Sequence, residues 1–266
     1  MFSVLILTLN EEHNLPRCLE SVCGCDDVVV LDSGSTDRTA EIALQAGARV
    51  FTRPFDDFAS QRNHAQRELP FRHPWVFHLD ADEQMTPTLM AECNAAVSDQ
   101  ACDGYFVAPH MIFHGRWIRR STDYPAFQAR FVRAPEFAFI QVGHGQREAP
   151  GTRMKYLRHC YLHDLSSGGD QTWYEKHARY ARDEAREHRQ GGRPNWRALR
   201  SADPLVRRRA AKALSYRLPF RPQLRFVYQY FLRGGFLDGA AGLGYCRLLA
   251  RYERLVSVEL RRAATT

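Results

Sequence analysis

The chain has 266 residues, of which 44% are hydrophobic and 25% are charged, enough for one large α/β domain or for a domain with an appendage. An aromatic content of 12%, with only 17 glycines and 13 prolines, excludes a disordered or collagen-like polymer. The apolar stretches near the C-terminus are interrupted by Arg233, Asp238 and Arg247, so we expect no membrane-spanning segment. Because no signal-peptide pattern follows Met1, we expect a cytoplasmic chain.

The net charge of +7 is unevenly distributed. Residues 195–266 contain fifteen arginines and lysines and four acidic residues, a net charge of +11, which leaves −4 for residues 1–194. Such asymmetry favours a polyanionic partner, either a nucleic acid or an anionic membrane surface, over a merely solvated set of arginine-rich helices. The seven cysteines include no C-x-x-C pair, which indicates reduced thiols rather than disulfides or a zinc site.

Short strands alternate with helices in the first hundred residues. The predicted strands are Val4–Leu9, Val28–Leu31, Arg49–Phe51 and Trp75–Leu79. The predicted helices are Leu15–Val22, Asp37–Ala46, Ser60–Leu69 and Thr86–Val97. Most of these strands are almost continuously apolar, which is typical of a parallel sheet that helices cover on both faces.

After Gly104 the predicted pieces become shorter, and long helices follow. The predicted strands there are Tyr105–Ala108, Phe127–Arg133 and Phe137–Val142, and the predicted helices are Gln171–Arg189, two that open at Asp203 and Arg221, and Gly239–Arg261. In the second strand apolar residues alternate with Gln128 and Arg130, so we expect one solvent-exposed face. The sequence therefore predicts an α/β domain over residues 1–192, with a mixed, mainly parallel sheet, and a basic helical extension over residues 193–266.

Acidic residues follow three of the predicted strands: Asn10-Glu11-Glu12, then Asp32, then Asp80-Ala81-Asp82-Glu83. Open α/β sheets bind ligands beyond these strand ends. Asp80 and Asp82 are two apart on an extended segment, so we expect both carboxylates on one face, where they suit Mg²⁺ or Mn²⁺. The alternative is that these acids only end strands or cap helices, as Asp37 would do before the second helix.

The three segments together resemble the N-terminal half of family 2 glycosyltransferases, which have the GT-A fold. The matching motifs are Val4–Glu12, Val30–Thr39 and Leu79–Glu83, in the same order and spacing. Within the family the chain is most similar to the lipopolysaccharide-core β-1,4-glucosyltransferase group and related exopolysaccharide enzymes, over about residues 1–190. The resemblance implies a nucleotide-sugar donor, UDP-glucose by default, and inversion at the anomeric carbon.

The resemblance also assigns site residues. Those that it places around the donor are Thr8, Asn10, Glu11, Asp32, Arg62 and Asp80. It makes Asp82 the principal ligand of Mn²⁺ or Mg²⁺, with Asp80 beside it and His163 as a late addition to the metal or diphosphate shell. Without the resemblance, Arg62 would be a surface helix residue, Thr8 a buried strand hydroxyl and His163 a packed loop histidine.

A general base is expected shortly after the last predicted strand, where the related group has a His-Glu pair. This sequence departs from that pattern, because Arg147 precedes Glu148 and the histidine is displaced to His144. We expect Glu148 to be the base, and the next candidates are His144 and then Asp123. The alternative is that Glu148 forms a structural salt bridge with Arg147 or Arg153.

The C-terminal extension interleaves basic and aromatic residues, a composition that suits attachment to an anionic bilayer. We expect it to bind the cytoplasmic face of the inner membrane, where a lipid-linked, lipopolysaccharide or exopolysaccharide acceptor is presented, and we expect no nucleic acid. The alternatives are packing on the catalytic domain and a dimer contact. The stripe Trp173, His177 and Tyr180 has helical spacing and is expected in a core.

Three other function classes fit less well. A sugar-phosphate nucleotidyltransferase should have a glycine-rich basic loop after the first strand, where Asn10-Glu11-Glu12-His13 stands instead. A dinucleotide-dependent oxidoreductase needs a G-x-G-x-x-G motif, and no strand is followed by one. A nucleic-acid-binding module built on the basic extension would leave the acidic strand ends unexplained, because they repel phosphates.

Overall fold

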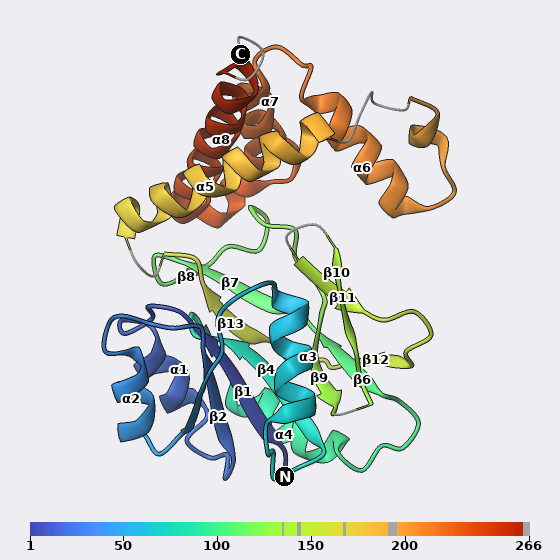
Figure 1. Cartoon of the computed structure of the whole chain (residues 1–266). Coiled ribbons are helices and arrows are strands. Elements are labelled where there is room, and N and C mark those ends of the chain that lie inside the picture. The colour runs from blue at the N-terminus through green and yellow to red at the C-terminus, as the bar shows by residue number, and fades with distance from the viewer. Residues whose placement is uncertain (135, 143–144, 167–168, 191–195, 263–266) are drawn as a thin grey trace. The chain divides into compact units, whose positions relative to one another are not determined.

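The structure is a computed structural model that describes residues 1–134, 136–142, 145–166, 169–190 and 196–262 (Figure 1). Its contacts divide the chain into two units. The sheet unit consists of Met1–Gly115 and Tyr124–Ser167, and the helical unit of Arg116–Asp123 and Gly168–Thr266. The domain boundary at residue 192 stays a prediction, and the contacts group the helix α5 (Gly169–Gln190) with the helices that follow it.

A seven-stranded sheet forms the centre of the sheet unit, in the order β12-β6-β9-β4-β1-β2-β3. Its strands are β1 (Ser3–Thr8), β2 (Val28–Asp32), β3 (Arg49–Thr52), β4 (Trp75–Asp80), β6 (Gly104–Val107), β9 (Gln128–Arg133) and β12 (Met154–Tyr156). Strands β1 to β4 are parallel, whereas β9 runs antiparallel to β4 and β6. The mixed, mainly parallel sheet predicted from the sequence is confirmed.

Helices cover both faces of this sheet (Figure 1). They are α1 (Leu15–Ser21), α2 (Thr39–Gln45), α3 (Phe58–Glu68) and α4 (Pro87–Ala96). Since side chains alternate along a strand, Val4 and Ile6 of β1 pack in one core cluster with residues of α1 and α4, whereas Leu5 packs in another with Ala65 of α3. This is the layered architecture that the resemblance to GT-A enzymes implies.

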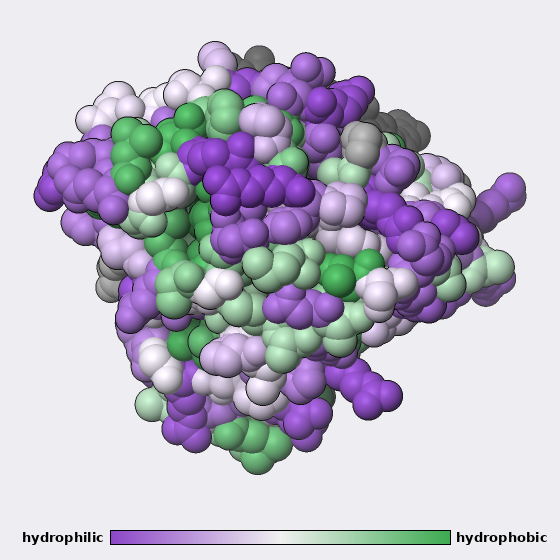
Figure 2. All heavy atoms as spheres, turned by 90° about the horizontal axis from the view of Figure 1, so that it is seen from below, coloured by the Kyte–Doolittle hydropathy of each residue, from purple (hydrophilic) through white to green (hydrophobic). Residues whose placement is uncertain are grey.

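Short strands complete the sheet unit. β10 (Phe139–Val142) and β11 (Gly145–Glu148) form an antiparallel pair, and β13 (Tyr161–Asp164) lies between β5 (Glu83–Gln84) and β7 (Pro109–Phe113). Of these strands only β10 was predicted, over the wider range Phe137–Val142, and the others show no clear alternation of apolar and polar residues. On the face seen in Figure 2, apolar residues lie among hydrophilic ones.

The helical unit contains the long helices α5 and α8. Its elements after α5 are η1 (Trp196–Arg200), α6 (Pro204–Ser215), α7 (Arg221–Val227), η2 (Tyr228–Leu232), η3 (Gly235–Asp238) and α8 (Gly239–Arg262), and β8 (Arg116–Trp117) belongs to it by contacts. The ring of His177 stacks on Trp173 at 3.9 Å and meets Tyr252 of α8 at 5.6 Å, so this stripe is a helix contact. Among the described helices, none has the length and apolar character needed to cross a membrane.

Candidate active site

The carboxyl ends of β2, β1 and β4 lie side by side, in that order, at one edge of the central sheet. Thr8 at the end of β1 pairs in register with Asp32 of β2, and Leu7 pairs with Asp80 of β4. The three sequence motifs therefore meet at the sheet edge where α/β proteins bind ligands.

The buried carboxylate of Asp32 organises the turn that follows β2. Its Oδ2 accepts hydrogen bonds from the backbone N–H groups of Gly34, at 3.0 Å, and Ser35, at 2.8 Å. Its Oδ1 accepts one from the hydroxyl of Thr8, at 2.9 Å. Gly34 adopts a φ of 93°, which favours glycine. Asp32 thus shapes the backbone next to the proposed donor site.

Asn10 and Glu11 join the loop after β1 to the loop after β2. The side-chain oxygen of Asn10 accepts from the backbone N–H of Thr36, and the backbone N–H of Asn10 donates to the hydroxyl of Ser35, both at 2.8 Å. The backbone N–H of Glu11 donates to the hydroxyl of Thr39, also at 2.8 Å. The two loops therefore hold each other in place.

The prediction that Asp37 is the N-cap of α2 was wrong by one position. The N-cap is Arg38, whose own side chain makes no capping hydrogen bond. Asp37 still serves the helix start, because its Oδ1 accepts from the backbone N–H of Thr39 at 3.0 Å.

Arg62 of α3 is buried and points its guanidinium at the carboxylate of Asp80. The Nη2 of Arg62 lies 2.6 Å from Oδ1 of Asp80, and the Nη2 of Arg130 lies 3.2 Å from Oδ2. Burial would raise the pKa of Asp80, but the two guanidinium groups outweigh it and hold that pKa well below the usual range. Asp80 is therefore ionised, and each of its oxygens faces an arginine.

Arg130 corrects a prediction, because β9 has no solvent-exposed face at this position. Arg130 is 3% exposed, and its Nη2 donates to Oε1 of the fully buried Glu83 at 2.7 Å. The alternation misleads here because the carboxylates of Asp80 and Glu83 form ion pairs with this guanidinium, which compensates its charge when it is buried. The other oxygen of Glu83 accepts from the backbone N–H of Asp80 at 2.8 Å. Burial raises the pKa of Glu83 to about 7, although Arg130 opposes this shift.

Glu83 and Arg130 are thus site residues to which the sequence analysis assigned no role. Glu83 was visible next to Asp82, but nothing in the sequence distinguished it from a solvated acid. Arg130 gave no signal at all, because its contact with Asp80 joins residues 50 positions apart in the chain.

Asp82 meets His163 of β13. Its Oδ2 lies 3.5 Å from Nε2 of His163, and the two side chains are 20% and 24% exposed. Burial would lower the pKa of His163, but the hydrogen bond to Asp82 and the negative charge around it raise that pKa to about 9. The predicted approach of these two residues is present, and it joins the end of β4 to β13.

This pair has the donor atoms that Mn²⁺ accepts, a carboxylate oxygen and an imidazole nitrogen. No group of three or more histidine, cysteine or acidic side chains suited to a metal occurs in the part of the chain that the structure describes. The oxygens of Asp80 face arginines, so Asp82 and His163 fit a cation best when phosphate oxygens of a donor complete its shell.

Glu148, the predicted base, ends β11 and is half-buried. It pairs in register with Phe139 of β10. The side chain of Asn63 on α3 holds Phe139 through both its backbone N–H and its carbonyl, each at 2.8 Å. The strand pair that carries Glu148 is therefore fixed to α3 at the residue next to Arg62.

The structure bears differently on the two other candidate bases and on the salt-bridge alternative for Glu148. His144 lies outside the described residues. Asp123 belongs by its contacts to the helical unit. Arg153, considered as a salt-bridge partner of Glu148, instead pairs with Asp103 at 2.6 Å.

Two buried polar side chains at this site keep atoms without a hydrogen-bond partner among the described residues. They are Nε and Nη1 of Arg62 and both ring nitrogens of His78. His78 is fully buried against the ring of Phe139, and burial lowers its pKa well below the ordinary value, so its imidazole is neutral. Arg62 thus keeps donors beyond the one that it gives to Asp80.

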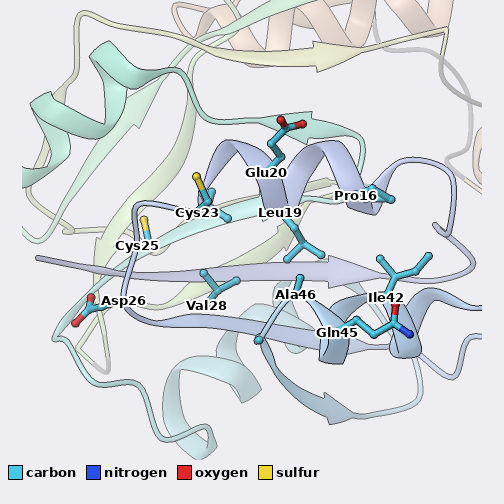
Figure 3. A pocket seen from close by; sticks show the side chains of 12 residues that line it. Pro16, Leu19, Glu20, Cys23, Cys25, Asp26, Val28, Ile42, Gln45 and Ala46 are labelled. Atoms are coloured by element: carbon cyan, nitrogen blue, oxygen red, sulfur yellow. The ribbon is translucent and has the colours of Figure 1, made fainter.

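A separate hollow of about 520 Å³ lies between α1 and α2 (Figure 3). Leu19, Ile42 and Val28 line it, and Val28 is the first residue of β2, whereas Asp32 is the last. None of the predicted site residues lines this hollow, so it is not the proposed donor site.

Comparison with known proteins gives a match to a family described as Glycosyl transferase family 2, over residues 3–152. The lipopolysaccharide core biosynthesis glycosyltransferase LpsC of Rhizobium meliloti (strain 1021) is 37% identical over 123 residues, which are 42% of this chain and 44% of LpsC. An uncharacterized glycosyltransferase of Rickettsia bellii (strain RML369-C) is 35% identical over 104 residues, 39% of this chain and 35% of that protein. The matches thus span less than half the length of these relatives.

Among solved structures, Staphylococcus aureus TarS 1–349 in complex with UDP-GlcNAc resembles the chain with a TM-score of 0.47 and 16% identity, covering 98% of this chain and 92% of that one. The glucosyl-3-phosphoglycerate synthase of Mycobacterium tuberculosis, in complex with Mn²⁺, UDP-glucose and phosphoglyceric acid, has a TM-score of 0.35 and 22% identity. That match covers 42% of this chain and 44% of the synthase chain.

Proposed function

Because the chain belongs to glycosyl transferase family 2, we propose that it transfers a hexose from a nucleotide diphosphate sugar to a hydroxyl group of a glycan or lipid-linked acceptor. UDP-glucose is the donor that we test first. The name of the relative LpsC supports an acceptor from lipopolysaccharide core synthesis.

One observation carries this proposal: beside the sheet edge where three parallel strands end, the segment after β4 and strand β13 form a carboxylate–imidazole pair, and α3 contributes a buried arginine that contacts Asp80. Asp82 and His163 lie 3.5 Å apart, and Arg62 is 1% exposed with two nitrogens that lack a partner among the described residues. A diphosphate is a polyanion that needs both a cation and hydrogen-bond donors, and this edge offers both.

In the proposed reaction the acceptor hydroxyl attacks the anomeric carbon directly. Glu148 takes the proton of that hydroxyl, the new C–O bond forms, and the bond between the anomeric carbon and the diphosphate oxygen breaks with its electron pair on the diphosphate. A single displacement of this kind inverts the anomeric configuration. Arg62 donates to the departing diphosphate, and Asp80, held between Arg62 and Arg130, keeps the guanidinium of Arg62 in place.

Asp82 and His163 would hold the Mn²⁺ or Mg²⁺ ion, which when bound supplies positive charge to the diphosphate. Thr8, Asn10, Glu11 and Asp32 contribute by fixing the two loops beside the nucleoside, through the hydrogen bonds that join these loops to each other and to the strand ends.

We also propose that the protein works at the cytoplasmic face of the inner membrane. The net charge of +11 over residues 195–266 supports this location, since an anionic leaflet attracts such a segment.

The test is a thermal-shift screen of nucleotide sugars with and without Mn²⁺. We expect one nucleotide diphosphate sugar to raise the Tm only when Mn²⁺ is present, because a ligand stabilises the folded state that binds it. We expect this shift to vanish in Asp82→Ala. The control is Asp26→Ala, because Asp26 precedes β2 at the opposite end of the sheet and pairs with His73.

Two results would contradict the proposal. One is stabilisation by a nucleoside triphosphate together with a sugar 1-phosphate but by no nucleotide sugar, which would indicate a nucleotidyltransferase. The other is equal stabilisation of the wild type and of Asp82→Ala, which would show that Asp82 does not hold the metal.

A further inference from the structure

The helical unit exposes a concentration of large apolar side chains over α7, η2 and η3. Leu232 is 76% exposed, Phe220 74% and Leu237 60%. The full set, called the apolar patch below, is Phe220, Leu224, Val227, Tyr228, Phe231, Leu232, Phe236 and Leu237. Most of these residues are spaced by three or four along α7 and η2, which places them on one helix face.

Buried polar groups fix the inner side of the same elements. Asp238 is buried and accepts hydrogen bonds from the backbone N–H groups of Arg120, at 2.9 Å, and Ser121, at 2.7 Å. Gln229 is 1% exposed and donates to the carbonyl of Ser121 at 2.9 Å. These buried polar anchors set which side of η2 and η3 faces inward, so the apolar patch is held on the outer side.

Close backbone packing makes this arrangement specific. A Cβ atom on Gly242 of α8 would lie 2.3 Å from the carbonyl oxygen of Gly235, and one on Gly235 would lie 2.8 Å from the carbonyl oxygen of Gln229. Only glycine allows η3 to approach its neighbours this closely. The outward-facing apolar side chains therefore belong to a tightly packed element rather than to a loose loop.

Exposed arginines accompany the apolar patch. Arg217 precedes Phe220, Arg233 follows η2, and the guanidinium of Arg116 lies 3.1 Å from the Cβ position of Gly239, directly after η3. The segments 116–123 and 216–240 contain seven arginines, of which Arg221 is buried and paired with Glu253, and two acidic residues. One of those two acids, Asp238, is buried.

We propose that the apolar patch and its arginines form a docking surface for an anionic lipid bilayer. Exposed leucine and phenylalanine side chains gain free energy by entering the acyl boundary, and arginines beside them bind lipid phosphates. This mode of attachment needs no membrane-spanning helix, and the described residues contain none. This inference rests on the proposed function, since it names the surface that meets a lipid-linked acceptor.

The charges argue against two other occupants. A symmetric dimer through the apolar patch would bring the arginines of both copies together, and like charges repel. The phosphates of a nucleic acid would pair with the arginines, but Leu232 and Leu237 would remain exposed to water beside the phosphate backbone. A bilayer accommodates both kinds of side chain.

The test is co-sedimentation of the full chain with vesicles of phosphatidylcholine alone and of phosphatidylcholine mixed with phosphatidylglycerol. We expect binding to the mixed vesicles and little binding to the neutral ones. The double variant Leu232→Ser with Leu237→Ser should bind roughly tenfold more weakly, because it loses apolar area without a change of charge. Leu44→Ser is the matched control, since Leu44 is a leucine of the sheet unit that is 61% exposed.

A second pair of variants tests the charge. Arg217→Gln with Arg233→Gln should weaken binding to the mixed vesicles by about tenfold. The control is Arg67→Gln with Arg158→Gln, two exposed arginines of the sheet unit. All variants should keep the donor-dependent Tm shift of the wild type, so failure of membrane binding and failure of the proposed transferase activity give different results.

Three results would overturn the docking surface. The first is equal sedimentation of the wild type and the double leucine variant with the mixed vesicles. The second is a concentration-dependent dimer in analytical ultracentrifugation that the leucine substitutions abolish, which would assign the patch to a second copy. The third is binding to duplex DNA that is as tight as binding to the mixed vesicles and equally weakened by the arginine substitutions.

Discussion

The sheet unit and the helical unit each bury a cluster of charged side chains, and the two clusters are built differently. In the sheet unit, two acids, Asp80 and Glu83, share Arg130, and Arg62 keeps nitrogens without a partner among the described residues. In the helical unit, two acids, Glu184 and Glu253, share Arg221, and Glu184 also takes partners from near α6 and from α8.

The contacts of Glu184 show what a cluster with a structural purpose looks like. Its carboxylate accepts from the hydroxyls of Tyr216, at 2.6 Å, and Tyr252, at 2.7 Å, and lies 3.2 Å from Nζ of Lys212. Burial would raise the pKa of Glu184, but the two hydroxyls and Lys212 lower it below the ordinary value. These contacts tie α5 to α6 and α8.

The difference lies in the position of each cluster. Both clusters shift two neighbouring pKa values in opposite directions, with Asp80 lowered and Glu83 raised to about 7 in the sheet unit, and Glu184 lowered and Glu253 raised in the helical unit. Both also keep arginine nitrogens without a partner among the described residues, on Arg62 and on Arg221. Divergent pKa values alone therefore do not mark a functional site. Asp80 stands where parallel strands end and α/β sheets bind ligands, whereas Glu184 is held by side chains of other helices.

The largest expected effect concerns catalysis in the sheet unit. Glu148→Gln should lower kcat by about 10³-fold, because removal of a general base typically costs 10²- to 10⁴-fold. Binding of the donor should be unchanged. The measurement is a steady-state assay with the donor that the thermal-shift screen identifies. Glu68→Gln, an exposed glutamate at the end of α3, is the control, and an equal kcat for both variants would exclude Glu148 as the base.

The charge cluster of the sheet unit can be broken at its centre. Arg130→Met should lower the free energy of unfolding by about 3–5 kcal/mol, because it leaves the buried Glu83 without its counter-charge. Adding Glu83→Leu should recover more than half of that loss but not the activity, since Asp80 still lacks Arg130. Urea unfolding measures both. A double variant as unstable as the single one would show that the ion pair is not the cause.

The cluster of the helical unit should respond to pH. Because the pKa of folded Glu184 is lowered, its contribution is present above the unfolded pKa of about 4.3 and is lost as the pH falls through the folded value. Glu184→Gln should therefore cost about 2 kcal/mol at neutral pH and much less in acid. Urea unfolding at several pH values checks this. Burial and the negative charge of Glu184 raise the pKa of Glu253, so the pH dependence that Glu253 contributes has the opposite sign and is smaller in Glu184→Gln than in the wild type.

The smallest expected effect is that of one hydroxyl in the same cluster. Tyr252→Phe removes a single donor to Glu184 while the hydroxyl of Tyr216 remains, and it should lower the free energy of unfolding by about 1 kcal/mol. Activity should not change. A loss of activity larger than the loss of stability would mean that the helical cluster also serves the reaction, and the comparison of the two units would fail.

Most of the regular elements could be predicted from the sequence. The first four strands were predicted to within one residue at each end, because β1, β2 and β4 are nearly continuous in apolar residues. The strands β5, β7, β11, β12 and β13 were missed, since their two to five residues show no clear period. The convergence of the acidic segments followed from the rule that parallel strands end at one sheet edge.

What the sequence by itself determined was local: which segments are strands and helices, which acids stand at strand ends, and where arginines and aromatic residues accumulate. Only the tertiary structure decided that Arg130 lies inside rather than on a wet face, that Asp82 meets His163, and that the apolar residues of η2 and η3 face outward. The physical reason is that burial and electrostatic pairing depend on residues distant in the chain, which neither spacing nor periodicity encodes.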